Sequence, residues 1–223
     1  MTDRKLRNVF VAALAASLAF ALLGPGIVSA SQNEPSVQLV KTLTYKDFHD
    51  PGKMVVVDEE GHESTFWGVY KFIGFEAIQT WKSGEQLQVV WKPGAGAGIV
   101  RVSSGAFFKL AFAVNEEHPI SVLGDRCTDH NGSTMGMQGC LGEESKRWDE
   151  EYDLLVADLL ASASDELKAD LGEANAAWEE YKGKFFDAYY HRYQGGGTVE
   201  IINRASLSVW FRMNRVRSLN WLE

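Results

Sequence analysis

The spacing of apolar residues changes near the middle of this chain, and this change most constrains its fold. Beyond Ser133, apolar side chains recur three and four residues apart, which is the spacing of one face of an α-helix. Before about residue 122, short apolar runs alternate with Gly and Pro signals roughly every ten residues. The sequence therefore predicts an α+β protein, in which a small antiparallel β domain precedes a disulfide-stapled three-helix antiparallel bundle.

Three helices follow from the apolar spacing. The first runs from Ser133 and Thr134 toward Ser162, and Ser164 with two acids begins the second. A Gly-Gly-Gly turn ends the second helix, and the third begins at about Thr198. The predicted inner seams are Leu141, Trp148, Tyr152, Leu155 and Leu159; Leu167, Leu171, Ala174, Trp178, Tyr181 and Phe185; and Ile202, Ala205, Val209, Val216 and Leu219. Such seams pack against other helices, so we expect all three to be buried.

The strands are predicted from short β-forming runs separated by turns. These runs are 37–40, 54–57, 65–70, 87–91 and 99–102, and the turns are 60–62, 82–85 and 93–98. The change from strands to helices is placed at residues 123–125.

The first thirty residues have the pattern of a cleavable secretory signal. Arg4, Lys5 and Arg7 precede an apolar stretch at 9–23, and small residues end the segment at Ala30. The stretch is about fifteen residues, short of the roughly twenty that span a bilayer. We expect a signal at 1–30, a β-rich domain at 31–124 and a helical domain at 125–223. The protein would be periplasmic or secreted, and soluble with no membrane span after cleavage. The alternative is an uncleaved membrane anchor.

The charge balance is acidic. The chain has 22 basic and 30 acidic residues, and its net charge becomes about −10 without residues 1–30. A surface of this sign repels nucleic acid and steers a cationic partner toward itself. Nucleic acid is therefore excluded as a partner.

Cys127 and Cys140 are the two cysteines of the chain. In an oxidising compartment their spacing favours one structural disulfide. A metal site would need more ligands than His130, the histidine between them, supplies. A redox pair more often has the C-x-x-C spacing.

No catalytic or metal-binding pattern stands out. Asp187 and His191 lie four residues apart on a predicted helix, but a metal site needs three or four ligands. The Gly-rich segment at 94–98 lacks the Lys-Ser/Thr ending of a phosphate-binding loop. Paired carboxylates at 143–144, 149–151 and 179–180 are interpreted as solvated helix faces. We therefore expect no enzymatic activity, no metal and no cofactor.

Several motifs in the helical half occur together. Cys127 and Cys140 flank Thr134-Met135, and Tyr152-Asp153-Leu154 follows. Further along are Leu171, Asn175 with Trp178 and Tyr181, a Gly-Gly-Gly-Thr turn, Arg215 and Leu219. Over about residues 125–222 this pattern resembles the LprI-type domain, a bacterial envelope module named for a lysozyme inhibitor. Members of that family often carry a second cysteine pair, where this chain has Phe185-Phe186 and Ser206-Leu207.

The resemblance implies a binding protein. C-type lysozymes are strongly basic, so it implies an inhibitor that binds a cationic, lysozyme-like muramidase, with Leu171, Trp178, Tyr181 and Arg215 as family motif and core residues. For the partner-binding surface we predict the acids of the exposed side of the first two helices: Glu143, Glu144, Asp149, Glu150, Glu179 and Glu180. Two alternatives remain open. One is an accessory envelope assembly protein, and the other is a cell-wall hydrolase whose carboxylates are brought together by the fold.

Overall fold

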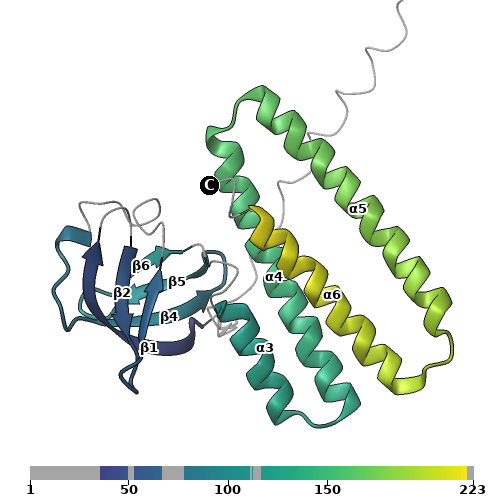
Figure 1. Cartoon of the computed structure of the whole chain (residues 1–223), viewed down its shortest axis with the longest axis horizontal. Coiled ribbons are helices and arrows are strands. Elements are labelled where there is room, and N and C mark those ends of the chain that lie inside the picture. Colours follow the sequence, from purple (N-terminus) through teal and green to yellow (C-terminus); the bar gives the residue numbers. More distant parts are fainter. Residues whose placement is uncertain (1–35, 50–52, 67–77, 111, 113–116, 220–223) are drawn as a thin grey trace, which may run out of the picture. The chain divides into compact units, whose positions relative to one another are not determined.

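The β-forming runs of the N-terminal half become one antiparallel sheet. The computed structural model describes residues 36–49, 53–66, 78–110, 112 and 117–219 (Figure 1). The strands are β1 (Gln38–His49), β2 (Lys53–Val57), β3 (Glu63–Phe66), β4 (Gln86–Lys92), β5 (Gly96–Arg101) and β6 (Ala106–Lys109). The first five correspond to the predicted strands, although residues 67–70 of the third prediction lie outside the described residues. β6 has no counterpart among the predicted strands.

β1 is the long inner strand of this sheet. The strand order is β3-β2-β1-β4-β5-β6, and every pairing is antiparallel. β1 pairs with β4 at Leu43, opposite Leu87, and with β2 at Tyr45, opposite Val56. Its register shifts between Leu39 and Lys41 and again after Tyr45, and such bulges bend a strand. β4 pairs with the first half of β1, and β2 pairs with its second half.

Serine caps begin two of the helices where the sequence predicts them. Ser133 accepts a hydrogen bond from the Gly136 N–H and caps α4 (Thr134–Ser162). Ser164 accepts one from the Leu167 N–H and caps α5 (Asp165–Tyr193). After a glycine turn, α6 (Gly197–Leu219) completes the predicted three.

A fourth helix precedes them, which corrects the predicted count. α3 (Pro119–His130) begins before the change of structure predicted at 123–125. The Nδ1 of His118 accepts a hydrogen bond from the Ile120 N–H at 3.3 Å and caps this helix, and Pro119 takes its first turn. Proline at that position was the available signal, because its fixed φ suits a helix start.

The predicted disulfide is confirmed. Cys127 of α3 and Cys140 of α4 form it, with their Cα atoms 5.5 Å apart. It therefore joins the unpredicted helix to the first predicted one.

One buried cluster continues from the sheet into the helices. Leu43 and Leu87 of the sheet belong to the same cluster as Ile120, Trp148 and Val216, and each of these side chains is at most 1 % exposed. Residues 35–223 form one compact unit. The division into domains at 31–124 and 125–223 stays a prediction. Within the described residues, no helix combines the length and apolar character needed to cross a membrane.

The predicted burial of the seams holds for α4 and not for α5. Leu141, Trp148, Leu155 and Leu159 of α4 are buried, whereas no residue of α5 is. α4 and α6 lie side by side, and α5 runs along the outside of this pair (Figure 1). Periodicity identifies the face of α5 but does not show how closely another helix covers it.

Candidate partner-binding surface

Arg215 of α6 lies where the three long helices meet. Its guanidinium carbon is 3.6 Å from the ring centre of Tyr152 on α4 and 4.1 Å from that of Trp178 on α5. It donates hydrogen bonds to Glu179 at 3.1 Å and to the Tyr152 hydroxyl at 2.8 Å. That hydroxyl donates to Asn175 Oδ1 at 2.9 Å. A planar cation that stacks and donates at once holds three helices at one point.

A cavity of about 430 Å³ opens beside Arg215. Apolar side chains of all three helices line it, among them Val156 of α4, Leu171 of α5 and Leu219 of α6. Lys168 adds a positive charge to the lining. A mostly apolar cavity of this size can receive an apolar side chain of a bound partner.

Five aromatic rings surround Phe211 of α6, which is 2 % exposed. The ring-centre distances to Phe211 are 6.2 Å for Trp178, 5.8 Å for Tyr181, 5.1 Å for Phe185, 5.6 Å for Phe186 and 5.1 Å for Trp210. We call these six residues the aromatic cluster. Its outer members remain open to solvent, since Tyr181 is 56 % and Trp210 49 % exposed. Bulky rings meeting at one point join α5 to α6 without burying α5.

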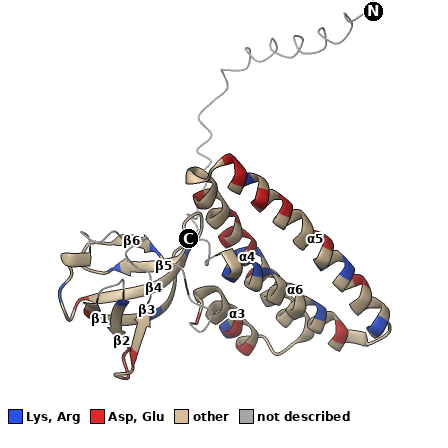
Figure 2. Cartoon of the chain, turned by 45° about the horizontal axis from the view of Figure 1, so that its top comes forward, with Lys and Arg blue, Asp and Glu red and all other residues tan. Residues whose placement is uncertain are grey.

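Charge is distributed unequally over the helices. Asp and Glu are frequent on α4 and α5, whereas α6 carries four arginines and one Glu (Figure 2). Arg212 pairs with Asp149 of α4 at 2.8 Å, and Arg215 pairs with Glu179 of α5. α6 thus supplies counter-charges to the two acidic helices.

Residues 127–218 match the model of a family described as lysozyme inhibitor LprI. The C-terminal part of this chain is an LprI-type domain. The match spans the disulfide, the Arg215 contacts and the aromatic cluster, and it leaves out the sheet. No curated protein and no solved structure matches the chain.

The six acids predicted as the partner-binding surface of the LprI-type domain already hold partners within the chain. For five of them, which are exposed or partly buried, the partners are Lys146 for Glu143, Arg212 for Asp149, the Gly94 N–H for Glu150, Arg215 for Glu179 and Lys184 for Glu180. Four of these five acids face a cationic side chain, and Glu150 accepts its hydrogen bond from a neutral N–H. The five are spread over two helices, α4 and α5.

Glu144 is buried, so its predicted exposure is wrong. It is 6 % exposed, accepts a hydrogen bond from Trp148 Nε1 at 3.2 Å, and lies against the Cα of Gly124 in α3. Burial away from water raises the pKa of Glu144 to about 7, and the negative charge of Asp125 acts in the same direction. The Trp148 hydrogen bond and the charge of Arg147 oppose this shift of the pKa. Glu144 therefore belongs to the α3–α4 interface.

Sequence reasoning also missed Glu151, which is 2 % exposed. Its carboxylate accepts a hydrogen bond from the Ala97 N–H at 2.8 Å, beside the Gly94 N–H bound by Glu150. Two adjacent acids of α4 thus bind the β4–β5 hairpin, Glu150 at its turn and Glu151 at the start of β5. The local sequence contains no signal for this, because the donors come from a hairpin more than fifty residues away.

Three side chains of kinds that can bind metal ions lie close together at the turn between β2 and β3. The ligand atoms of Asp58, Glu60 and His62 lie within 4.8 Å of one another, with Glu60 and His62 exposed. Asp58 Oδ1 accepts hydrogen bonds from the His62 N–H at 2.8 Å and the Glu60 N–H at 3.0 Å. These bonds, that from His62 above all, lower the pKa of Asp58. Asp58 therefore shapes the turn predicted at residues 60–62.

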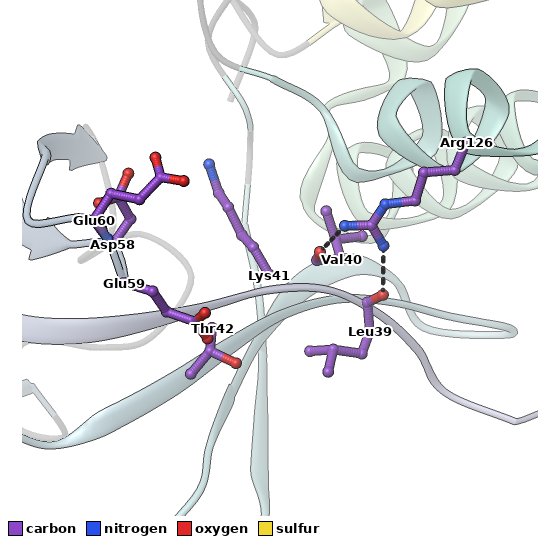
Figure 3. A pocket seen from close by; sticks show the side chains of 8 residues that line it. All are labelled: Leu39, Val40, Lys41, Thr42, Asp58, Glu59, Glu60 and Arg126. Atoms are coloured by element: carbon purple, nitrogen blue, oxygen red, sulfur yellow. Dashed lines mark hydrogen bonds between the residues drawn. The ribbon is translucent and has the colours of Figure 1, made fainter. Parts of the chain in front are cut away.

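An open depression of about 450 Å³ lies near this turn (Figure 3). Arg126 reaches into it from α3 and donates hydrogen bonds to the carbonyl oxygens of Leu39, at 3.2 Å, and Val40. The register of β1 shifts between Leu39 and Lys41. Arg126 thus satisfies two backbone carbonyl groups at the point where the register of β1 shifts. Its role there is structural.

Proposed function

We propose that this protein is an exported inhibitor of lysozyme-like muramidases that acts by binding the enzyme and has no catalytic activity of its own. The observation that carries the proposal is the match of residues 127–218 to the LprI family. The contacts of Arg215 support it, because they fix the three long helices of the matched region at one point. A rigid framework of this kind suits a binding surface.

The proposal includes export and a two-domain organisation. Residues 1–30 are the signal, residues 31–124 the β-rich domain and residues 125–223 the inhibitory domain, in the periplasm or outside the cell. The Cys127–Cys140 disulfide supports this location, because disulfides persist in oxidising compartments.

Net negative charge has a defined role in this proposal. Glu143, Asp149, Glu150, Glu179 and Glu180 contribute to a negative field that draws in a basic enzyme, although each also holds a partner within the chain. A field of this kind raises the association rate and is screened by salt. Glu144 lies inside the fold and is left out of the surface.

The test is a muramidase assay in which purified protein, residues 31–223, is titrated against a C-type lysozyme at low and at physiological salt. We expect dose-dependent inhibition whose inhibition constant rises with salt. Circular dichroism and a thiol assay on the same sample establish that the protein is folded and its disulfide formed. Absence of inhibition by such a sample, for each muramidase tested, would contradict the proposal and favour an assembly role.

A further inference from the structure

α5 is a 29-residue helix without a buried residue. Its inner side touches α4 and α6 through Asn175, Trp178 and the aromatic rings that meet Phe211. Helical stability in proteins comes mostly from packing of an apolar face. A long helix that is covered on one side therefore has further surface that a partner could cover.

Two large apolar side chains stand at the edge of this inner side. Tyr181 is 56 % and Phe185 36 % exposed, and their ring centres are 6.2 Å apart. Both rings also rest on Phe211, so their positions are held in place before any partner binds. Aromatic side chains that are fixed and accessible are the usual energetic anchors of protein interfaces.

Two acids without a counter-charge lie on the same helix, about three and two turns before Tyr181. Within the described part of the chain, no ion pair involves Asp170 or Glu173, and both are exposed on α5. At 100° per residue, Asp170 projects about 20° and Glu173 about 80° from the direction of Tyr181 around the helix. They differ from Glu179 and Glu180, which are neutralised by Arg215 and Lys184. The exposed edge of α5 thus combines apolar anchors with uncompensated negative charge farther along the helix.

We propose that the exposed edge of α5, with Tyr181 and Phe185 as anchors and with Asp170 and Glu173 as a charged rim farther along the helix, is the surface that contacts a basic muramidase. This inference rests on the proposed function and names its contact site. The occupant follows from charge complementarity, because a basic protein gains both from burying the rings and from meeting the free carboxylates. Asp149 and Glu150 of α4, in contrast, are held by Arg212 of α6 and by the Gly94 N–H of the sheet.

Tyr190 provides a matched control for Tyr181. It lies on the same helix and is 50 % exposed, but nine residues of helix place it on the opposite side. Within the described residues its ring neighbour is His191, outside the aromatic cluster. Asp129, an exposed acid of α3, is the matched control for Asp170.

The experiment measures inhibition constants for wild type, Tyr181→Ala, Phe185→Ala and Tyr190→Ala with a C-type lysozyme. We expect a rise of roughly tenfold or more for Tyr181→Ala and a change below about threefold for Tyr190→Ala. Asp170→Lys leaves the aromatic packing untouched and should raise the constant several-fold more than Asp129→Lys at low salt, with the gap closing as salt is added. Thermal unfolding of each variant verifies that it is folded.

Three outcomes would overturn the inference. If wild type inhibits and the Tyr181 and Asp170 variants behave like their controls, the surface is wrong while the inhibitor function stands. If wild type does not inhibit, the proposed function fails and this surface fails with it. If light scattering shows a dimer that Tyr181→Ala dissociates, a second copy of the chain occupies the face.

Discussion

The carboxylate of Glu151 on α4 accepts a hydrogen bond from the backbone N–H of Ala97 in β5, over a distance of 2.8 Å. The pair joins the helical part to the sheet inside the protein, since Glu151 is 2 % and Ala97 0 % exposed. We expect Glu151→Ala to lower the free energy of unfolding by about 2–3 kcal/mol, because a buried N–H loses its acceptor. Urea unfolding measures this loss. Asp153→Ala, at an exposed position of the same helix, should change stability by less than about 0.5 kcal/mol, and equal effects of the two would contradict the buried contact.

Alanine substitutions at Gly94 and Gly96 distinguish backbone strain from a steric clash in the hairpin that Glu150 and Glu151 bind. Both glycines have positive φ, +83° and +73°, which disfavours any other residue. A Cβ at Gly96 would collide with the Glu151 carboxylate, whereas one at Gly94 would meet nothing within 4 Å. We therefore expect Gly94→Ala to cost about 1 kcal/mol and Gly96→Ala at least about 2 kcal/mol more. Equal unfolding midpoints for these two variants in urea would argue against the placement of Glu151.

Glu144 should make stability depend on pH. Its pKa is about 7 in the folded protein against a usual 4.5, so the folded state binds the proton more tightly than the unfolded state. The contribution of Glu144 to stability is therefore highest below about pH 4.5, falls as pH rises to about 7, and stays lowered above it. At about 1.4 kcal/mol per pKa unit, the charged form costs on the order of 3 kcal/mol.

Glu144→Gln removes this cost and retains an oxygen for the Trp148 N–H. We expect the variant to exceed wild type in stability at pH 8 by about 1–3 kcal/mol and to match it near pH 4.5. Urea unfolding at several pH values provides the comparison. Glu143→Gln should show no gain at pH 8, because a hydrogen bond from Lys146 lowers the pKa of Glu143. Parallel stability curves for wild type and Glu144→Gln would rule out the buried position.

Arg215→Lys should weaken the packing of α5 against α4 and α6. A lysine keeps the charge but cannot stack on Tyr152 and Trp178 while donating to Glu179. We expect faster amide hydrogen exchange along α5 and a loss of about 1–2 kcal/mol in stability. Arg204→Lys, at an exposed position of the same helix α6, is the control. If the amide hydrogens of α5 exchange at the wild-type rate in both variants, Arg215 does not hold the three helices together.

Sequence reasoning located several elements because the information is local. The side chains of Ser133 and Ser164 each satisfy an N–H group three residues away, so the starts of α4 and α5 are encoded at those positions. The sequence prediction did not include α3, although Pro119 marks its start. The strand signals that continue to about residue 122 outweighed this single helix signal.

The contacts of the candidate partner-binding surface were less predictable from the sequence than the helix starts. The LprI motif places Trp178 and Arg215 in one domain, but their stacking and the burial of Phe211 under five rings require α5 and α6 to be brought together. Among the predicted acids, nothing in the sequence distinguishes Glu144 from Glu143, although one is buried and the other exposed.

The sequence by itself determined that strands precede helices, where α4 and α5 are capped, and the membership of the C-terminal part in a family. Only the tertiary structure decided that Glu144 and Glu151 are internal and that the apolar seam of α5 stays largely uncovered. Helical periodicity states which residues share a face. The burial of that face depends on elements remote in sequence, such as Gly124 for Glu144, Ala97 for Glu151 and Phe211 for α5.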